Sequence, residues 1–443
     1  MTVQDKFNQK ETLLIVSDFP EKTKRGEKNY GIAWYTKETL EPIVKKYGRR
    51  AIVLAEKGED NSPRLLSNDK ILLLRVFDPK HRTLFPIILK WLLTFSKIKR
   101  VYIHSEFCTN GGIKNFVLLP FFLLLIRLSG RRITYFAHNV ITDFSNFAVH
   151  LNLPQAKSII FLFNQSLKIY YFLLGILTEK IVVMDEVMKK RMEKFVSKNK
   201  IEFIPIWVKQ KRYSKSKDAV RREMKIGKND FVLLYFGFVT WYKGADFLIK
   251  NFRKLKINGK NLKLIVAGGP AYSLRDKKHY QSFYRKQILE ARKDKRITLT
   301  GFVPEAQIGK YFTAADLVVF PYRGYLGSSG VLSHVLSFKK PFIVSRKMAE
   351  IFNNQDLTES LAVTGVEKGE MIFEATRRGL GASIQELRQK SKIAKLADCS
   401  RRFAKKRSCR ELLPLYYERV FSGSEKLVQK AEEVRYAITS AQN

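Results

Sequence analysis

The chain has 443 residues, of which 45% are hydrophobic and 12% aromatic. This is enough apolar material for two domains with packed cores, and it excludes a disordered polymer. The 82 Lys and Arg residues outnumber the 41 Asp and Glu residues, so the formal net charge is +41. A charge of this size attracts phosphate groups, whether on nucleotides, nucleic acids or an anionic membrane.

The cysteines and the N-terminus indicate the compartment. Cys108, Cys399 and Cys409 form no CxxC pair, so neither a disulfide framework nor a cysteine zinc site is predicted. The first strongly apolar run is the short LLIVS, which is not the layout of a secretory signal. We therefore expect a reducing, cytoplasmic location.

From residue 11 to 205, short apolar runs alternate with helix-length segments, which indicates βαβ units and a parallel sheet. The runs are TLLIVS, RAIVLA, RVYIHSE, RITYFAHN and EKIVVMDE.

Three longer apolar segments cover residues 84–95, 116–126 and 158–177, and the third is interrupted by Asn164, Gln165 and Lys168. A bilayer span needs about 20 apolar residues, so we expect none of them to cross a membrane. Buried helices of the first domain are the favoured interpretation, and helices lying on an anionic membrane surface are the alternative.

The alternation restarts after a basic, aperiodic connection that contains Pro205, where we place the domain boundary. The later runs are FVLLYFG, KLIVAGG, ITLTGFV, LVVFPYR and KPFIVS. After residue 384 the strands stop, and residues 388–410 carry ten basic residues and one acid. We favour a solvated helix face for that segment over a phosphate or membrane patch. The fold class predicted for both halves is α/β, doubly wound.

Gly237 ends an apolar run, and Lys243 and Gly244 follow at the start of a predicted helix. Where a parallel strand passes into a helix, backbone N–H groups and the helix dipole can hold an anion, and glycine leaves room for it. Lys243 would add a positive charge to a phosphate oxygen. The spacing is not that of a Walker loop, so in isolation a solvated lysine after a strand end is the simpler interpretation.

Residues 301–345 add GFVP, ADLVVFPYR, a GSSG loop that opens a helix, and KKPFIVS, in that order. With them the chain resembles the retaining nucleotide-sugar glycosyltransferases of family 4 (group 1), in particular a subgroup with a Ser-Gly phosphate loop in place of paired glutamates. The resemblance is specific over residues 231–346 and looser over residues 11–205. It implies the GT-B fold, with two Rossmann-like domains facing a central cleft.

The resemblance also implies a division of labour. Residues 1–205 would bind the acceptor and residues 206–414 the nucleotide sugar, with a final helix over about residues 415–443 packing back on the first domain. Lys243 would hold the donor diphosphate and take part in catalysis. Phe302 and Val303 would face the base through their main chain, and Tyr322 would line the same cleft. The other donor-binding candidates are Gly31, Gly237, Ser328, Ser329, Gly330, Val331 and His334.

The second domain departs from the family pattern at three positions. Phe238 stands where many members have an arginine, and Leu326 and His334 stand where they have two glutamates. His334 can still donate or accept a hydrogen bond to a ribose. These departures keep a catalytically divergent scaffold protein among the alternatives.

In the first domain, YGIAWYTKETL resembles the family's glycine-rich entry loop, with Gly31 and Ile32 approaching the diphosphate and the acceptor through their backbone. TYFAHN ends in His138 and Asn139, where the family places a sugar-binding histidine. We assign His138 a catalytic role and Asn139 acceptor binding, with an ordinary polar residue as an equal alternative for His138. Ligands of open α/β sheets gather at such strand ends. His104, on a second strand end, is a weaker candidate.

The sequence thus predicts a retaining, metal-independent glycosyltransferase with a UDP- or GDP-sugar as donor and no other cofactor. The acceptor would be a glycan or a lipid-linked hydroxyl, and the inner face of the plasma membrane an anionic partner surface. A basic nucleic-acid-binding protein is the second hypothesis, but the chain shows no helix-turn-helix, zinc-finger or RNA-binding sheet signature. Nucleic acid is therefore not an expected partner.

Overall fold

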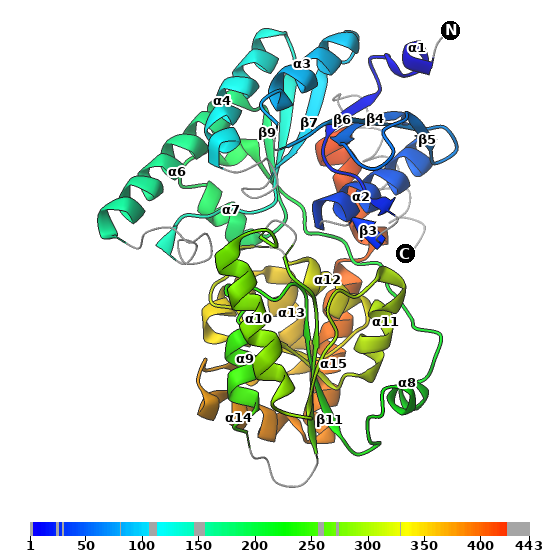
Figure 1. Cartoon of the computed structure of the whole chain (residues 1–443). Helices are drawn as coiled ribbons and strands as arrows, with labels where there is room; N and C mark the ends of the chain where they lie inside the picture. Colours follow the sequence, from blue (N-terminus) through cyan, green and yellow to red (C-terminus); the bar gives the residue numbers. More distant parts are fainter. Residues whose placement is uncertain are drawn as a thin grey trace. The chain divides into compact units, whose positions relative to one another are not determined.

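The computed structural model describes residues 3–23, 26–28, 31–79, 81–105, 113–145, 156–255, 261–271, 274–327 and 329–422. The chain forms two compact units, shown by sequence colour in Figure 1. The first comprises Met1–Val140, Ser166–Ile206 and Cys409–Asn443, and the second comprises Ile141–Gln165 and Trp207–Ser408. Each unit holds a mainly parallel sheet with helices on both faces, so the predicted fold class is confirmed.

Among the described residues, the sheet of the first unit has eight strands in the order β10-β9-β8-β7-β1-β4-β6-β5. All neighbours pair in parallel except β5, which is antiparallel to β6. The strands are apolar runs because both faces of a parallel sheet are covered. They are β1 (Leu13–Val16), β4 (Ala51–Glu56), β5 (Arg64–Leu66), β6 (Ile71–Phe77), β7 (Arg100–Ser105), β8 (Arg132–Ala137), β9 (Lys180–Val183) and β10 (Ile201–Phe203), with a separate hairpin of β2 (Glu21–Thr23) and β3 (Gly26–Lys28).

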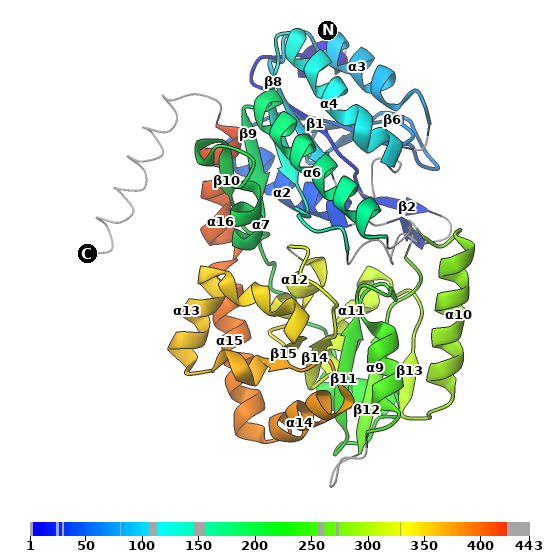
Figure 2. The ribbon, with the colours of Figure 1, turned by 90° about the vertical axis from the view of Figure 1, so that its left-hand side faces the viewer.

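Helices cover the two faces of this sheet according to the direction of each crossover. The chain moves from β6 through β7 and β8 to β9 in one direction and from β1 to β4 in the other, and right-handed crossovers then place the helices on opposite faces. Figures 1 and 2 show α3, α4 and α6 on one face and α2 and α16 on the other. The helices are α1 (Val3–Phe7), α2 (Gly31–Tyr47), α3 (Leu84–Thr94), α4 (Ile113–Leu128), α6 (Lys157–Leu177), α7 (Glu186–Met192), η1 (Lys198–Lys200), α16 (Cys409–Tyr416) and the π-helical η4 (Tyr417–Phe421).

Helix α6 runs without a break through Asn164, Gln165 and Lys168, the polar residues that interrupt its apolar run. By length and composition alone, it is the one helix in the described residues that could cross a bilayer. One side of it nevertheless packs on the sheet, where the hydroxyls of Tyr170 and of Tyr135 on β8 lie 3.0 Å apart. The helix thus serves as a crossover between two paired strands.

The chain returns to the first unit at α16. The Tyr416 hydroxyl lies 2.9 Å from that of Tyr35 on α2, and the Tyr417 ring stacks on that of Tyr47 at 3.6 Å. These contacts bring the end of the described chain onto α2. Residues 423–443, which include most of the predicted final helix, lie outside the described residues.

The second unit contains a parallel sheet whose described strands follow the order β13-β12-β11-β14-β15-β16. This is the 3-2-1-4-5-6 order of a dinucleotide-binding fold, in which the strand order reverses between β11 and β14. Ligands bind such sheets at the carboxyl ends of the strands beside that reversal. The strands are β11 (Phe231–Phe236), β12 (Leu262–Ala267), β13 (Ile297–Leu299), β14 (Leu317–Phe320), β15 (Phe342–Ser345) and β16 (Ile372–Phe373).

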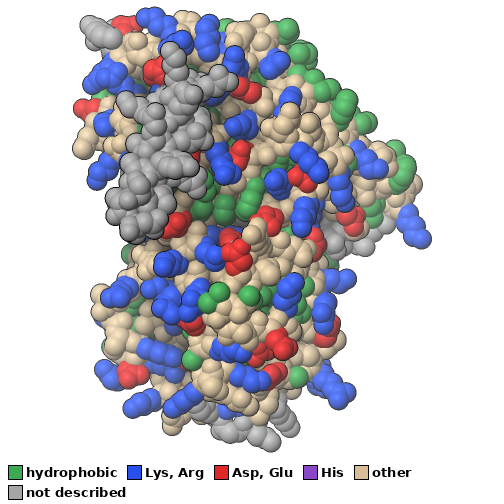
Figure 3. Space-filling view, turned by 180° about the vertical axis from the view of Figure 1, so that it is seen from behind, with side chains coloured by type: hydrophobic (Ala, Val, Ile, Leu, Met, Phe, Trp, Pro, Cys, Tyr) green, Lys and Arg blue, Asp and Glu red, His purple; other side chains and the backbone are tan. Residues whose placement is uncertain are grey.

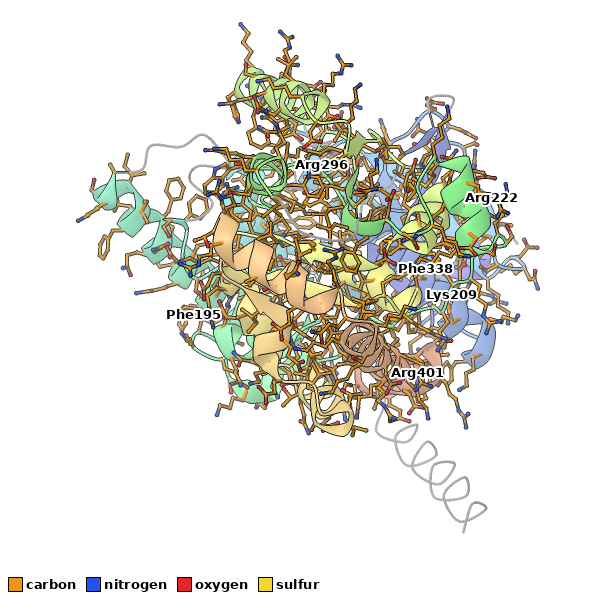
Figure 4. The ribbon with its side chains drawn as sticks, turned by 90° about the horizontal axis from the view of Figure 1, so that it is seen from below. Phe195, Lys209, Arg222, Arg296, Phe338 and Arg401 are labelled. Carbon is orange, nitrogen blue, oxygen red and sulfur yellow. The ribbon has the colours of Figure 1, made fainter. Side chains whose placement is uncertain are left out.

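Side-chain caps fix several helix ends in this unit. Ser216 accepts a hydrogen bond from the Ala219 N–H at the start of α8, and Arg296, labelled in Figure 4, donates to the carbonyls of Arg253 and Leu255 just after α9. The helices are α8 (Lys217–Glu223), α9 (Ala245–Phe252), α10 (Lys278–Arg292), α11 (Glu305–Ala314), α12 (Gly330–Ser337), η2 (Arg346–Asn353), α13 (Gln355–Thr364), η3 (Lys368–Met371), α14 (Arg377–Leu387) and α15 (Lys390–Lys406).

The basic segment after residue 384 forms α15. One side of this helix is buried through Leu396, Cys399 and Phe403. Arg401, labelled in Figure 4, and Arg402 both pair with the partly exposed carboxylate of Asp398. The arrangement is that of an amphipathic helix with a charged, solvated side.

Candidate active site

The loops that carry the predicted phosphate motifs lie where the second sheet reverses its strand order. The loop after β11 holds Gly237 and Lys243, and the loop after β14 leads through Tyr322 to α12. Both strands are almost fully buried, so the chain leaves the core only at these ends. The two predicted motifs therefore meet at the ligand-binding edge of this fold.

Three glycines allow the backbones at this edge to approach each other. Gly237 has φ 114°, and a Cβ on Gly268 would lie 1.8 Å from the Gly237 carbonyl oxygen. Gly244 has φ 70°, and a Cβ there would lie 1.9 Å from the Pro321 oxygen. No side chain fits at Gly244 or Gly268 without moving a neighbouring strand end, so the loops need glycine for their own packing.

Lys243 lies in the turn that enters α9. Its Nζ is 5.8 Å from the ring centres of both Phe238 and Tyr322, and it would be 3.2 Å from a Cβ on Gly237. The Thr240 hydroxyl accepts a hydrogen bond from the Lys243 N–H at 3.3 Å. The ammonium group is thus held over the end of β11 by two aromatic faces.

Helix α12 points its N-terminus at the same place. A Cβ on Gly237 would lie 3.0 Å from Cγ2 of Val331, in the first turn of α12. Ser329 is the N-cap and makes no side-chain capping bond, and Gly330 is exposed. The predicted site residue Ser328 lies outside the described residues. Backbone N–H groups of the first turn are therefore near the Lys243 ammonium group.

Tyr322 adds a buried hydroxyl to this edge. The side chain is 4% exposed, and its hydroxyl has no hydrogen-bond partner among the described residues. Burial raises the pKa of Tyr322, and the nearby Ser329 side chain offsets part of that rise without making a hydrogen bond of good distance and angle. The hydroxyl therefore stays protonated and can donate a hydrogen bond to an anion.

Arg323 holds the Lys243 loop in place through contacts with Asp246, Tyr242 and Trp241. Its two terminal nitrogens donate to the two Asp246 oxygens at 2.8 and 2.7 Å, and its backbone N–H donates to the Tyr242 carbonyl at 2.9 Å. The guanidinium carbon is 4.5 Å from the Trp241 ring centre. A bidentate pair of this kind holds both the loop and the first turn of α9.

Phe238 takes the position where many family members have an arginine. Its side chain packs on a cluster with Tyr280 of α10, together with Phe283 and Tyr284. The Tyr280 hydroxyl donates to the Val239 carbonyl at 2.7 Å. Phe238 therefore anchors the loop to α10.

Two further donor-binding candidates, Phe302 and His334, differ in exposure. Phe302 is 51% exposed beside Gly269, whose Cβ would lie 2.8 Å from the Phe302 nitrogen, while Val303 is buried. The His334 ring packs 5.4 Å from the ring of Phe236 and is partly buried. Burial lowers the pKa of His334 to about 4, with Lys211 adding to the effect and Glu305 opposing it. The ring is neutral near pH 7.

In the first unit, His138 follows β8 directly and faces a second histidine. His138 Nε2 lies 3.2 Å from Nδ1 of His104 on β7, and the Tyr35 ring lies edge-on to His138 at 5.0 Å. Burial lowers the pKa of His138 to about 3, and it lowers that of His104 well below its usual value, with His138 adding to the effect. Both imidazoles are therefore neutral, and one donates to the other.

The entry-loop candidates lie at the start of α2. Gly31 is its exposed first residue, and a Cβ there would meet no described atom within 4 Å. Ile32 is buried, and its carbonyl accepts a hydrogen bond from Thr36 at 2.9 Å. Asn139 follows His138 and is partly buried. The side chain of Ile32 belongs to the core, so only its backbone could reach an acceptor.

Sequence reasoning missed Gly268, Tyr280 and the Arg323–Asp246 pair. Two adjacent glycines at the end of KLIVAGG were the signal for Gly268. No local sequence pattern predicts the contact between Arg323 and Asp246, which are 77 positions apart. Across the described residues, no three His, Cys, Asp or Glu side chains are grouped as a metal site requires. Metal independence stays a prediction.

Comparison with known proteins identifies the domain around this site. Residues 216–353 match the family described as glycosyl transferases group 1. These residues belong to the group 1 glycosyltransferases. The segment includes Lys243, Tyr322 and α12, so the resemblance based on these motifs is confirmed.

A curated relative of this chain is the lipopolysaccharide 1,2-N-acetylglucosaminetransferase of Salmonella typhimurium (strain LT2). The two are 26% identical over 171 residues, which is 38% of this chain and 44% of the relative. The match thus spans less than half the length of that enzyme.

Solved structures of glycosyltransferases share the fold of the whole chain. Anabaena HepE, crystallised with UDP and glucose, has a TM-score of 0.60 at 15% identity and covers 97% of this chain and 100% of its own. Sucrose-phosphate synthase from Thermosynechococcus elongatus has a TM-score of 0.64 at 13% identity and covers 94% and 100%. The fold is GT-B, as predicted.

Proposed function

We propose that this group 1 glycosyltransferase is a retaining enzyme that transfers a sugar from a UDP- or GDP-sugar to a hydroxyl of a glycan or lipid-linked acceptor. The observation that supports it most is the convergence of three anion-binding elements at the reversal point of the second sheet. These are the Lys243 ammonium group, the first turn of α12 and the buried Tyr322 hydroxyl.

The relatives favour UDP over GDP and an acceptor on a lipid. HepE was crystallised with UDP and with UDP-glucose, and the Salmonella enzyme is named for transfer of N-acetylglucosamine in lipopolysaccharide. A lipid-linked acceptor would place the enzyme in the cytoplasm, at the inner face of the plasma membrane. We propose that location and a peripheral attachment.

In the proposed reaction, the bond between the sugar C1 and the diphosphate oxygen breaks, and a bond between C1 and the acceptor oxygen forms on the same face. The acceptor proton passes to the departing diphosphate oxygen, and the nucleoside diphosphate leaves. Lys243, the α12 N–H groups and Tyr322 stabilise the charge that develops on the diphosphate. This route uses neither a protein nucleophile nor a metal ion.

The first unit would supply the acceptor side. A neutral His138 can donate a hydrogen bond to, or accept one from, a sugar hydroxyl, and the contact of its Nε2 with His104 leaves its Nδ1 for that bond. We assign acceptor binding to Asn139 and to the Ile32 backbone, and donor binding to the exposed Gly31. Phe302, Val303 and His334 are assigned to the nucleoside.

Nucleotide binding tests the proposal. Isothermal titration with UDP, UDP-sugars and GDP-sugars should give saturable binding, and Lys243→Ala should weaken it by about 10- to 100-fold, since a hydrogen bond to a charged group contributes about 1.5–3 kcal/mol. The control Lys250→Ala, which replaces an exposed lysine in the last turn of α9, should bind like the wild type. No nucleotide binding by the folded protein, or equal binding by both variants, would refute the site.

A second measurement separates catalysis from binding alone. Release of UDP from the best-binding sugar nucleotide, followed by HPLC, should be detectable with the wild type and lost in Lys243→Ala. Binding without release or transfer would favour the divergent scaffold. Tight, salt-sensitive binding of DNA or RNA with no nucleotide-sugar binding would favour the nucleic-acid hypothesis.

A further inference from the structure

The outward sides of α3, α4 and α6 are unusually apolar. Of the sixteen large hydrophobic side chains exposed among the described residues, eleven lie on these three helices. Phe121 is 61% exposed, Leu128 74% and Phe172 57%. We call this surface the outer helix face; its members are Leu93, Val117, Leu118, Phe121, Leu124, Leu128, Phe161, Leu162, Ile169, Phe172 and Ile176.

The spacing of these residues shows that they form stripes. On α4, Val117, Phe121, Leu124 and Leu128 recur every three or four residues, and on α6, Leu162, Ile169 and Ile176 recur every seven. Both patterns place the side chains on one side of a helix. The opposite side of each helix is also apolar and packs inward. The outer apolar residues of these helices therefore do not pack on their own sheet.

The three helices lie on the same face of the first sheet. Phe85 of α3 stacks on Phe122 of α4 at 4.6 Å. Figures 1 and 2 show α4 and α6 as neighbours on this face, and in Figure 3 hydrophobic side chains gather along the upper right margin, on the side of these helices. The stripes therefore lie on the same side of the first sheet.

The charges on these helices indicate which kind of partner binds that surface. None of the three contains an Asp or Glu, while Lys90, Arg127 and Lys168 are exposed on them. A second copy of this chain, with a net charge of +41, would bring basic groups against basic groups. An anionic bilayer accepts apolar side chains below its headgroups and pairs basic side chains with its phosphates.

We infer that the outer helix face binds the surface of an anionic phospholipid bilayer, with α4 and α6 lying in the interface. Helix α6 stays on the sheet, because Leu167, Tyr170 and Leu174 are buried against it and Lys200 donates to the Gly175 carbonyl at 2.6 Å. Only its outer side enters the headgroup layer. This inference deepens the proposed function by naming the surface for the attachment, and it uses no residue of the donor site.

Vesicle cosedimentation of the full chain tests it. The wild type should bind vesicles of phosphatidylglycerol and phosphatidylcholine better than vesicles of phosphatidylcholine alone, and salt should weaken the binding. Phe121→Gln with Phe172→Gln should weaken it at least about tenfold. The control Leu289→Gln with Val363→Gln, which replaces two exposed apolar residues elsewhere, should bind like the wild type.

Charge-removing variants and a measurement of the oligomeric state complete the test. Arg127→Gln with Lys168→Gln should weaken binding to anionic vesicles by about fivefold for each residue, and Arg222→Gln with Lys250→Gln should not. Unchanged binding by the Phe121 and Phe172 variant, or no binding by the folded wild type, overturns the inference. A wild-type dimer in light scattering that this variant dissociates also overturns it, because a second copy would then cover the face. UDP titration without vesicles tests the donor site separately.

Discussion

Arg323 binds Asp246 through both terminal nitrogens, at 2.8 and 2.7 Å, and so joins the end of β14 to the first turn of α9. The Lys243 loop lies between these two points, and Arg323 also donates to the Trp241 carbonyl within it. The pair therefore holds the loop in one conformation between β14 and α9. Its effect on a diphosphate would be indirect, through Lys243.

Arg323→Ala should weaken UDP binding at least about fivefold and lower the free energy of unfolding by about 1–3 kcal/mol, because Asp246 and the Trp241 carbonyl lose their donors. Arg323→Lys should recover little of the binding, since an ammonium group cannot reproduce the bidentate geometry. Titration calorimetry and urea unfolding measure the two effects. Arg346→Ala, which breaks an exposed pair with Glu374, is the control. Normal UDP binding by Arg323→Ala would show that the loop keeps its conformation without the Arg323–Asp246 pair.

Two glycine substitutions should show which glycine is required for packing and which for UDP binding. Gly268→Ala would place a methyl group 1.8 Å from the Gly237 oxygen, so we expect a loss of at least about 2 kcal/mol of stability. Gly330→Ala meets no described atom within 4 Å and should leave the unfolding midpoint unchanged. The same variant should weaken UDP binding severalfold, because the methyl group crowds the approach to the α12 N-terminus. If Gly330→Ala binds UDP normally, the diphosphate does not approach that closely.

The two parallel sheets and the position of the Lys243 and α12 loops at strand ends could be predicted, because buried parallel strands are continuous apolar runs and glycines mark where they end. The contacts that support those loops could not. Phe238 packs on Tyr280 across a connection of 41 residues, and the sequence gives no sign of that pairing. Likewise, His104 faces His138 only because β7 and β8 pair in a register that sets Ser105 beside Ala137.

Polar residues interrupt the apolar run of α6 without ending the helix. Asn164 and Gln165 are weak helix breakers, and their side chains can stay near the surface while the backbone continues. The Asn164 amide oxygen accepts a hydrogen bond from the Phe144 N–H at 2.9 Å. Polar residues in an apolar run therefore change what a helix contacts and need not end it.

Tyr322→Phe should distinguish a structural hydroxyl from a ligand-binding one. The hydroxyl is buried without a described partner, so its removal should leave stability unchanged or raise it slightly. UDP affinity should fall by about 5- to 50-fold if the hydroxyl donates to the diphosphate. Tyr284→Phe, on α10 beside Phe238, is the matched control and should leave UDP affinity unchanged. Equal UDP affinity in the wild type and Tyr322→Phe would remove this hydroxyl from the site.

The His104–His138 pair should make folding stability depend on pH. Burial favours the neutral forms, so the unfolded chain takes up protons first as the pH falls below the usual histidine pKa of about 6.5. The stability provided by the neutral pair is fully present above about pH 6.5 and decreases toward the folded pKa of His138, about 3, by up to about 1.4 kcal/mol per pH unit for each histidine. Urea unfolding between pH 7.5 and 4.5 should show this decrease, and His138→Gln should have a shallower one. His279→Gln, an exposed histidine on α10, should keep the wild-type slope. A wild-type slope in His138→Gln would mean that His138 is hydrated and titrates equally in the folded and unfolded chain.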